Sequence, residues 1–116
     1  MSEGTSYLFE VATPLGLSVR TTVDYWSLLE AKHPKLRGRA QDVAQVLAHP
    51  DQVCQSRQDR AVFLYYRTDQ QRLLCAVVKR LDGEGFLITA YPCDTIKEGE
   101  RVWPTSESST IRSEKP

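Results

Sequence analysis

The first apolar segments of the chain predict a β-hairpin. Residues Tyr7 to Val11 and Leu17 to Val23 are rich in β-branched and aromatic residues. The short stretch between them contains Pro14 and Gly16, which favour a turn. The N-terminal region is therefore expected to form two antiparallel strands.

Two segments with helical spacing of apolar residues follow the hairpin. Asp24 is a suitable N-cap for a helix over Tyr25 to Lys32, and Pro34 ends that helix because the residue before a proline favours an extended conformation. A second apolar stripe predicts a helix from about Arg39 to Ala48.

The next part of the chain has the pattern of a β-meander. Ala61 to Arg67, Leu73 to Arg80 and Phe86 to Tyr91 are dense in strand-forming residues, and the turn sequence Asp82 to Gly85 joins the last two. Consecutive strands with such short connections pair antiparallel. The predicted fold class is α+β, with the hairpin and both helices packed on a three-stranded antiparallel sheet.

Strict alternation assigns the side chains of these strands to two faces. Lys79 is expected to share a face with Cys75, and Leu87 to share a face with Thr89 and Tyr91. One face should pack on the helices, and the other should be concave and partly open. A cation, a threonine and a tyrosine on the open face would then be able to contact RNA together.

Length and composition support one domain. The chain has 116 residues, with 41% hydrophobic and 26% charged residues, enough to form a single core. We assign residues 1–104 to this domain. Residues 105–116 are polar and rich in serine, and we expect them to be disordered.

Charge and cysteine content limit the environment and the partners. Fifteen basic residues balance fifteen acidic ones, which argues against a protein that coats nucleic acid non-specifically. The three cysteines have wide spacings and no CxxC pair, as expected of reduced thiols in the cytoplasm. The first residues do not have the pattern of a signal peptide, and no apolar run is long enough to span a bilayer.

The loop between the two predicted helices concentrates positive charge. Lys32, Lys35, Arg37 and Arg39 lie within eight residues that include no acid. They form either a phosphate-binding site or a solvated loop, and the sequence leaves both open. His33 lies among them and is the residue there suited to proton transfer near neutral pH, or it is an exposed capping histidine.

Other kinds of chemistry find little support. His33 and His49 are sixteen positions apart, with no cluster of carboxylates or thiols to complete a metal site. The glycines flank turns and do not open a helix, so no phosphate-binding glycine loop is expected. We therefore expect neither a metal nor a cofactor.

Five segments, taken in order, resemble the phage and bacterial branch of the barnase–EndoU–colicin–RelE-like nuclease superfamily. The resemblance covers residues from about Asp24 to Trp103 and lies in the order and spacing of these segments. They read HPKLRGR, VLAHPDQVCQS, FLYYR, LLCAVVK and GFLITAYPCDTIKEGERVW.

The resemblance implies N-terminal helices on a four-stranded antiparallel sheet, with RNA lying across that sheet. It also implies metal-independent cleavage, in which the 2′-hydroxyl attacks the adjacent phosphate. His33 would be the general base or acid, Arg67 or Lys79 would hold the phosphate, and Thr89 with Tyr91 would orient it or transfer a proton. The implied RNA contacts are Lys32, Lys35, Arg37, Arg39, Arg60 and Lys97.

The implied role is a ribonuclease, such as a toxin or a phage-derived effector. Because this chain is neutral where the RelE-like toxins are strongly basic, a small RNA such as tRNA is the expected substrate. A toxin of this kind would have a cognate antitoxin or immunity protein. The alternative is an inactive module of the same fold that binds RNA or a protein partner.

Overall fold

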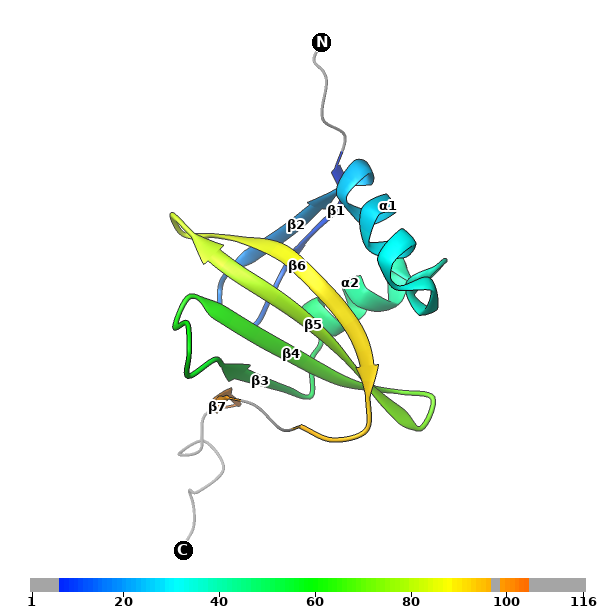
Figure 1. Cartoon of the computed structure of the whole chain (residues 1–116). Helices are drawn as coiled ribbons and strands as arrows, with labels where there is room; N and C mark the ends of the chain where they lie inside the picture. Colours follow the sequence, from blue (N-terminus) through cyan, green and yellow to red (C-terminus); the bar gives the residue numbers. More distant parts are fainter. Residues whose placement is uncertain (1–6, 97–98, 105–116) are drawn as a thin grey trace, which may run out of the picture.

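The computed structural model describes residues 7–96 and 99–104, which form one seven-stranded sheet with two α-helices (Figure 1). The order of strands in the sheet is β1-β2-β6-β5-β4-β3-β7. The strands are β1 Tyr7–Ala12, β2 Ser18–Thr22, β3 Gln52–Gln55, β4 Val62–Asp69, β5 Arg72–Leu81, β6 Glu84–Cys93 and β7 Glu100–Trp103.

The helical segments are α1 (Val23–Lys32), the 3₁₀ helix η1 (Pro34–Leu36) and α2 (Ala40–Ala48). The N-cap of α1 is Thr22, whose hydroxyl accepts a hydrogen bond from the Tyr25 amide at 3.0 Å. The predicted Asp24 cap is therefore wrong. Asp24 lies in the first turn instead, where its negative charge interacts favourably with the positive end of the helix dipole.

The main core lies between the helices and one face of the sheet. Its helical residues are Trp26, Leu29, Leu36, Val43, Val46 and Leu47, and its sheet residues include Val19, Tyr65, Ala76, Val78 and Leu87. These positions follow the helical and strand periodicities of the sequence. The α+β class predicted from them is confirmed.

Strand β2 joins the hairpin to the rest of the sheet through a very short parallel contact with β6. Only Val19 and Gly85, and then Arg20 and Phe86, are in register. A Cβ atom on Gly85 would lie 2.8 Å from Cγ2 of Val19 and 3.0 Å from Cδ2 of Leu17. Glycine is therefore required where the two strands approach each other.

A β-bulge changes the face assignment along β6. Val77 pairs with Thr89 and Val78 pairs with Leu87, so Ile88 has no partner on β5. As a result, Leu87 and Ala90 both pack in the main core, and Thr89 and Tyr91 lie on the opposite face. The prediction that Leu87 shares a face with Thr89 and Tyr91 is wrong, because it assumed unbroken alternation.

The sheet is larger than predicted. The antiparallel β4-β5-β6 meander was expected, but β3 and β7 were not predicted as strands, because each has only four residues and no clear alternation. The predicted disorder of residues 105–116 and the contact by Lys97 lie outside the described residues. In the described part of the chain, neither helix has the length and apolar content needed to span a membrane.

The first testable prediction concerns a buried hydrogen bond in the main core. The Tyr65 hydroxyl donates to Oγ1 of Thr13 at 2.9 Å, and both residues are buried. Tyr65→Phe leaves the Thr13 hydroxyl buried without its donor and should lower the free energy of unfolding by about 1–2 kcal/mol. Urea denaturation followed by circular dichroism measures this change.

The matched variant is the double substitution Tyr65→Phe with Thr13→Val, which removes both partners. It should recover part of the stability lost in Tyr65→Phe, since no orphaned hydroxyl remains. Equal stability of the wild type and Tyr65→Phe would contradict the assigned role of this bond.

Candidate functional site

The basic loop between α1 and α2 lies against the C-terminal end of β6, where it forms a hollow of about 320 Å³. We call this the basic hollow. The loop side of the hollow carries Lys32, His33 and Lys35, and the strand side carries Tyr91 and Pro92. Its remaining lining residues are Pro34, Leu36 and Ala90.

The short helix η1 fixes the loop on the sheet. Leu36 is fully buried in the main core, whereas His33 and Lys35 are exposed. The loop therefore presents its polar side chains to solvent while one leucine anchors it. Within the described chain, Lys32, Lys35 and Arg37 make no ion pair, so their charges stay available for a ligand.

A second polar hollow of about 310 Å³ adjoins the first and shares Lys35 and Pro92 with it. Arg39 and Arg72 contribute further positive charge. Both are already paired: Arg39 contacts Asp42 and Asp69, and Arg72 contacts Asp94 at 3.0 Å. The two hollows together form a continuous polar surface along the ends of β4, β5 and β6.

Arg72 was not among the predicted site residues. It follows Gln70 and Gln71, both of which have positive φ angles. This tight turn folds β5 back along β4 and brings Arg72 near the basic loop. A basic residue in the short connection between the predicted strands 61–67 and 73–80 was the available signal, but the sequence does not show that this connection faces the loop.

The predicted sheet cations lie elsewhere. Arg67 donates to the backbone carbonyl of His49 at 2.5 Å, and Lys79 pairs with Asp59 at 3.3 Å. The Ala61 amide and the Lys79 ammonium hold the pKa of Asp59 below its ordinary value. Arg60 lies 3.6 Å from Glu100 near the opposite edge of the sheet. None of these three cations lines the basic hollow.

The second sheet face, which the sequence predicts to be open, is closed at its centre. Cys54, Leu64, Tyr66 and Cys75 form a separate buried cluster there. Gly99, which directly precedes β7, packs on Cys54. The centre of this face is therefore filled by buried side chains and is not an open concave surface.

Thr89 and Tyr91 lie on this second face with Lys79, as the strand pairing shows. Oγ1 of Thr89 is buried and makes no hydrogen bond within the described chain. The Tyr91 hydroxyl bonds the thiol of Cys75. Tyr91 therefore borders the basic hollow, while its hydroxyl faces the buried cluster around Cys54 and Cys75, which we call the thiol cluster. Thr89 does not line the basic hollow.

The thiol cluster is strongly desolvated. Burial raises the pKa of the Cys75 thiol to about 12, although the hydroxyls of Tyr91 and Tyr66 partly oppose this shift. Burial, with Cys75, Tyr91 and Cys54 nearby, also raises the pKa of Tyr66 well above its ordinary value. Both groups are uncharged at neutral pH and act as structural residues.

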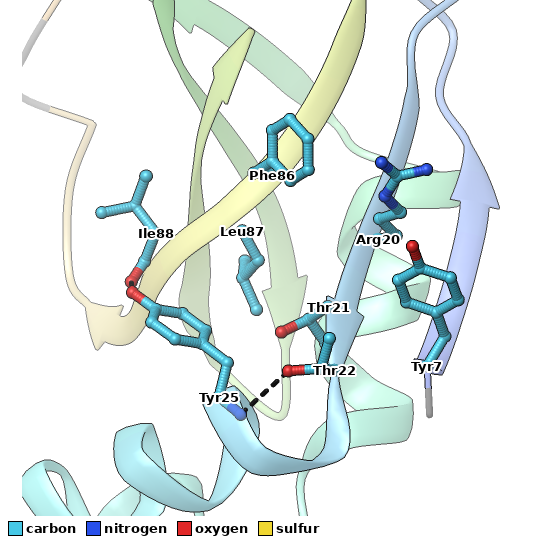
Figure 2. Close-up of a pocket in the computed structure, with 8 residues that line it drawn as sticks. All are labelled: Tyr7, Arg20, Thr21, Thr22, Tyr25, Phe86, Leu87 and Ile88. Atoms are coloured by element: carbon cyan, nitrogen blue, oxygen red, sulfur yellow. Dashed lines mark hydrogen bonds between the residues drawn. The ribbon is translucent and has the colours of Figure 1, made fainter. Parts of the chain in front are cut away.

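A third cavity, of about 370 Å³, opens where β2 and β6 diverge (Figure 2). We call it the split pocket. Three aromatic side chains, Tyr7, Tyr25 and Phe86, line it together with Arg20, Thr21, Thr22, Leu87 and Ile88. The Tyr25 hydroxyl donates to the Ile88 carbonyl at 2.6 Å, which ties α1 to the unpaired bulge of β6.

The described residues contain no group of three or more His, Cys, Asp or Glu side chains arranged to hold a metal ion. Comparison with known proteins finds no matching family model, no matching curated protein and no matching solved structure.

Thiol reactivity tests the closed second face. At pH 8, a thiol with a pKa of about 12 has about one thiolate in ten thousand molecules, so Cys75 should resist alkylation. Cys93 is partly exposed and should react first. Mass spectrometry after timed iodoacetamide treatment measures the order, and unfolding in urea should make the rates similar. Equal native rates for Cys75 and Cys93 would contradict a closed face.

Proposed function

We propose that the protein is a metal-independent endoribonuclease whose substrate phosphate binds in the basic hollow. The observation that carries this proposal is the placement of exposed His33 between Lys32 and Lys35 in one hollow. The lysines supply unpaired positive charge for a phosphate, and histidine supplies a group that exchanges protons near neutral pH.

The proposed reaction is internal attack by an RNA 2′-hydroxyl on the neighbouring phosphorus. The new O–P bond replaces the bond to the 5′-oxygen, leaving a 2′,3′-cyclic phosphate and a 5′-hydroxyl. His33 accepts the proton of the attacking hydroxyl or donates one to the leaving oxygen, and water exchanges the other proton. Lys32 and Lys35 stabilise the extra negative charge on the phosphate in the transition state.

This proposal uses fewer residues than the family resemblance implied. Arg67, Lys79 and Thr89 line neither of the two polar hollows. We assign these three residues no role in the reaction. Arg39 and Arg72, in the adjoining hollow, are placed to contact neighbouring phosphates of a bound strand. A small RNA such as tRNA remains the proposed substrate, and a cognate inhibitor protein would have to cover the basic hollow.

The nuclease proposal is tested with purified protein and total bacterial RNA in EDTA. The wild type should release fragments with cyclic phosphate ends, and His33→Ala should slow cleavage about a hundredfold to ten-thousandfold. His49→Ala is the matched control, because His49 is also exposed but lies outside the hollow. Its Arg67 contact uses the backbone carbonyl and survives the substitution.

Three results would overturn the proposal. They are loss of cleavage in EDTA, equal rates for wild type and His33→Ala, and products without cyclic phosphate. Circular dichroism of both histidine variants checks that they are folded.

A second candidate function is RNA binding without cleavage. The specific observation in its favour is that one histidine, His33, lines the basic hollow, whereas cleavage requires both a base and an acid. Such a module would use the same lysines but release the RNA intact. Intact RNA at high protein concentration, together with retained binding, would select this function.

Salt dependence of RNA binding tests the lysine contacts under either function. The double variant Lys32→Gln with Lys35→Gln should bind a single-stranded oligoribonucleotide more weakly. The negative slope of log K against log salt should become less steep by about 1.4. The control is Arg57→Gln with Arg101→Gln, which removes the same charge from two exposed residues outside both polar hollows. Fluorescence anisotropy measures the binding, and equal slopes for the two variants would contradict a phosphate site in the basic hollow.

A further inference from the structure

The split pocket exists because β2 and β6 pair at only two positions. After Arg20 and Phe86 the two strands no longer pair, and β6 carries a bulge at Ile88 two residues further on. Tyr25 enters from the first turn of α1 and bonds the Ile88 carbonyl. The cavity is thus bordered by β1, β2, β6 and α1, and its volume of about 370 Å³ fits one small ring system and not a helix.

The lining of the split pocket favours a planar aromatic ligand. Tyr7, Tyr25 and Phe86 bring three aromatic rings to a cavity of this size. Arg20 lies over the rings of Tyr7 and Phe86, at 5.2 Å and 5.0 Å from their centroids. Rings and a guanidinium plane are the surfaces on which nucleobases stack.

One buried hydroxyl at the wall of the split pocket favours a ligand that also forms hydrogen bonds. Thr21 is only 4% exposed, and its Oγ1 has no hydrogen-bond partner within the described chain. Figure 2 shows this hydroxyl pointing into the space between Leu87 and Tyr25. A buried hydroxyl without a partner costs stability, and a hydrocarbon ligand would leave that cost in place.

Arg20 adds further donors at the edge of the pocket. A guanidinium has five N–H groups, and the ion pair of Arg20 with Glu84 at 2.5 Å leaves others for a ligand. Together with the stacking on Tyr7 and Phe86, this contact holds the donors of Arg20 in place before a ligand binds. The pocket therefore combines stacking surfaces, an unpartnered hydroxyl and fixed donors.

The split pocket and the basic hollow lie along the same side of β6. The former uses Phe86 to Ile88, and the latter uses Ala90 to Pro92. They also lie at opposite ends of α1, which contributes Tyr25 to one and Lys32 to the other. One RNA strand following β6 would pass both sites.

We propose that the split pocket binds one base of the RNA whose phosphate occupies the basic hollow. This inference rests on the proposed function, and it adds a specificity site to it. Thr21 and Arg20 read the hydrogen-bonding edge of the base, and the aromatic rings bind its faces. The pocket therefore selects the nucleotide at a fixed distance from the cleaved or bound phosphate.

The experiment uses the four neutral nucleosides as probes, since they carry no phosphate and do not need the basic hollow. In ¹H–¹⁵N NMR titrations at millimolar concentrations, one or more of them should shift the amides of Thr21, Thr22, Leu87 and Ile88. Thr21→Val should weaken the best-bound nucleoside about fivefold to tenfold, the effect of one lost hydrogen bond.

Thr89→Val is the matched control. It also removes a buried hydroxyl without a partner, but from the second face of the sheet. Neither variant loses a hydrogen bond within the described chain, so both should remain folded and at least as stable as the wild type. Thr89→Val should bind the nucleosides like the wild type.

The outcomes separate this inference from the proposed function. If nucleosides shift the amide resonances of the split pocket and only Thr21→Val weakens their binding, the base site stands, even where RNA is not cleaved. If RNA is bound or cleaved but no nucleoside shifts these amides, the base site is wrong and the nuclease proposal survives. Equal binding by both valine variants would also overturn it. So would tighter binding of indole, or of a short extended peptide, than of any nucleoside.

One further arm distinguishes RNA from a free nucleotide as the natural ligand. A short oligoribonucleotide containing the best-bound base should lose affinity in Thr21→Val and also in the Lys32→Gln, Lys35→Gln variant. The free nucleoside should be affected by Thr21→Val alone. An oligoribonucleotide insensitive to Thr21→Val would contradict simultaneous use of the two sites by one strand.

Discussion

The contact between β2 and β6 is the constraint on which the arrangement of the other elements depends. It joins the N-terminal hairpin to the meander through two residue pairs, and it requires Gly85 because any side chain there would collide with Val19 and Leu17. Since α1 begins directly after β2, this contact also fixes where the helix starts. The direction of α1 then determines where its C-terminal end, and the basic loop that follows, meet the sheet.

The bulge at Ile88 works together with that contact. It gives Leu87 and Ala90 to the main core and turns Thr89 and Tyr91 toward the second face. The freed Ile88 carbonyl is satisfied by the Tyr25 hydroxyl, so the separation of β2 and β6 leaves this polar group paired. A continuous parallel ladder between β2 and β6 would have filled the space that is now the split pocket.

Burial divides the polar residues of this protein into two groups. The second face has become a small core of thiols and phenols, and burial keeps Cys75 and Tyr66 uncharged at neutral pH. Exposed Lys32 and Lys35 lie where the loop after α1 meets β6. A chain with zero net charge can therefore hold a local basic site. The nearby carboxylates of Asp69 and Asp94 pair with Arg39 and Arg72, and Lys32 and Lys35 are left without an acidic partner in the described chain.

The sequence by itself determined the α+β class, the helices, the meander and the basic loop with His33, because each depends on local periodicity and neighbouring residues. It did not reveal β3 and β7, whose pairing joins residues far apart in the chain. The structure alone decided that Arg67 and Lys79 are bound elsewhere, that Arg72 lies beside Lys35, and that the second face is closed. Such contacts depend on how the sheet bends and on which strands meet, and a single bulge is enough to reverse the faces that alternation assigns.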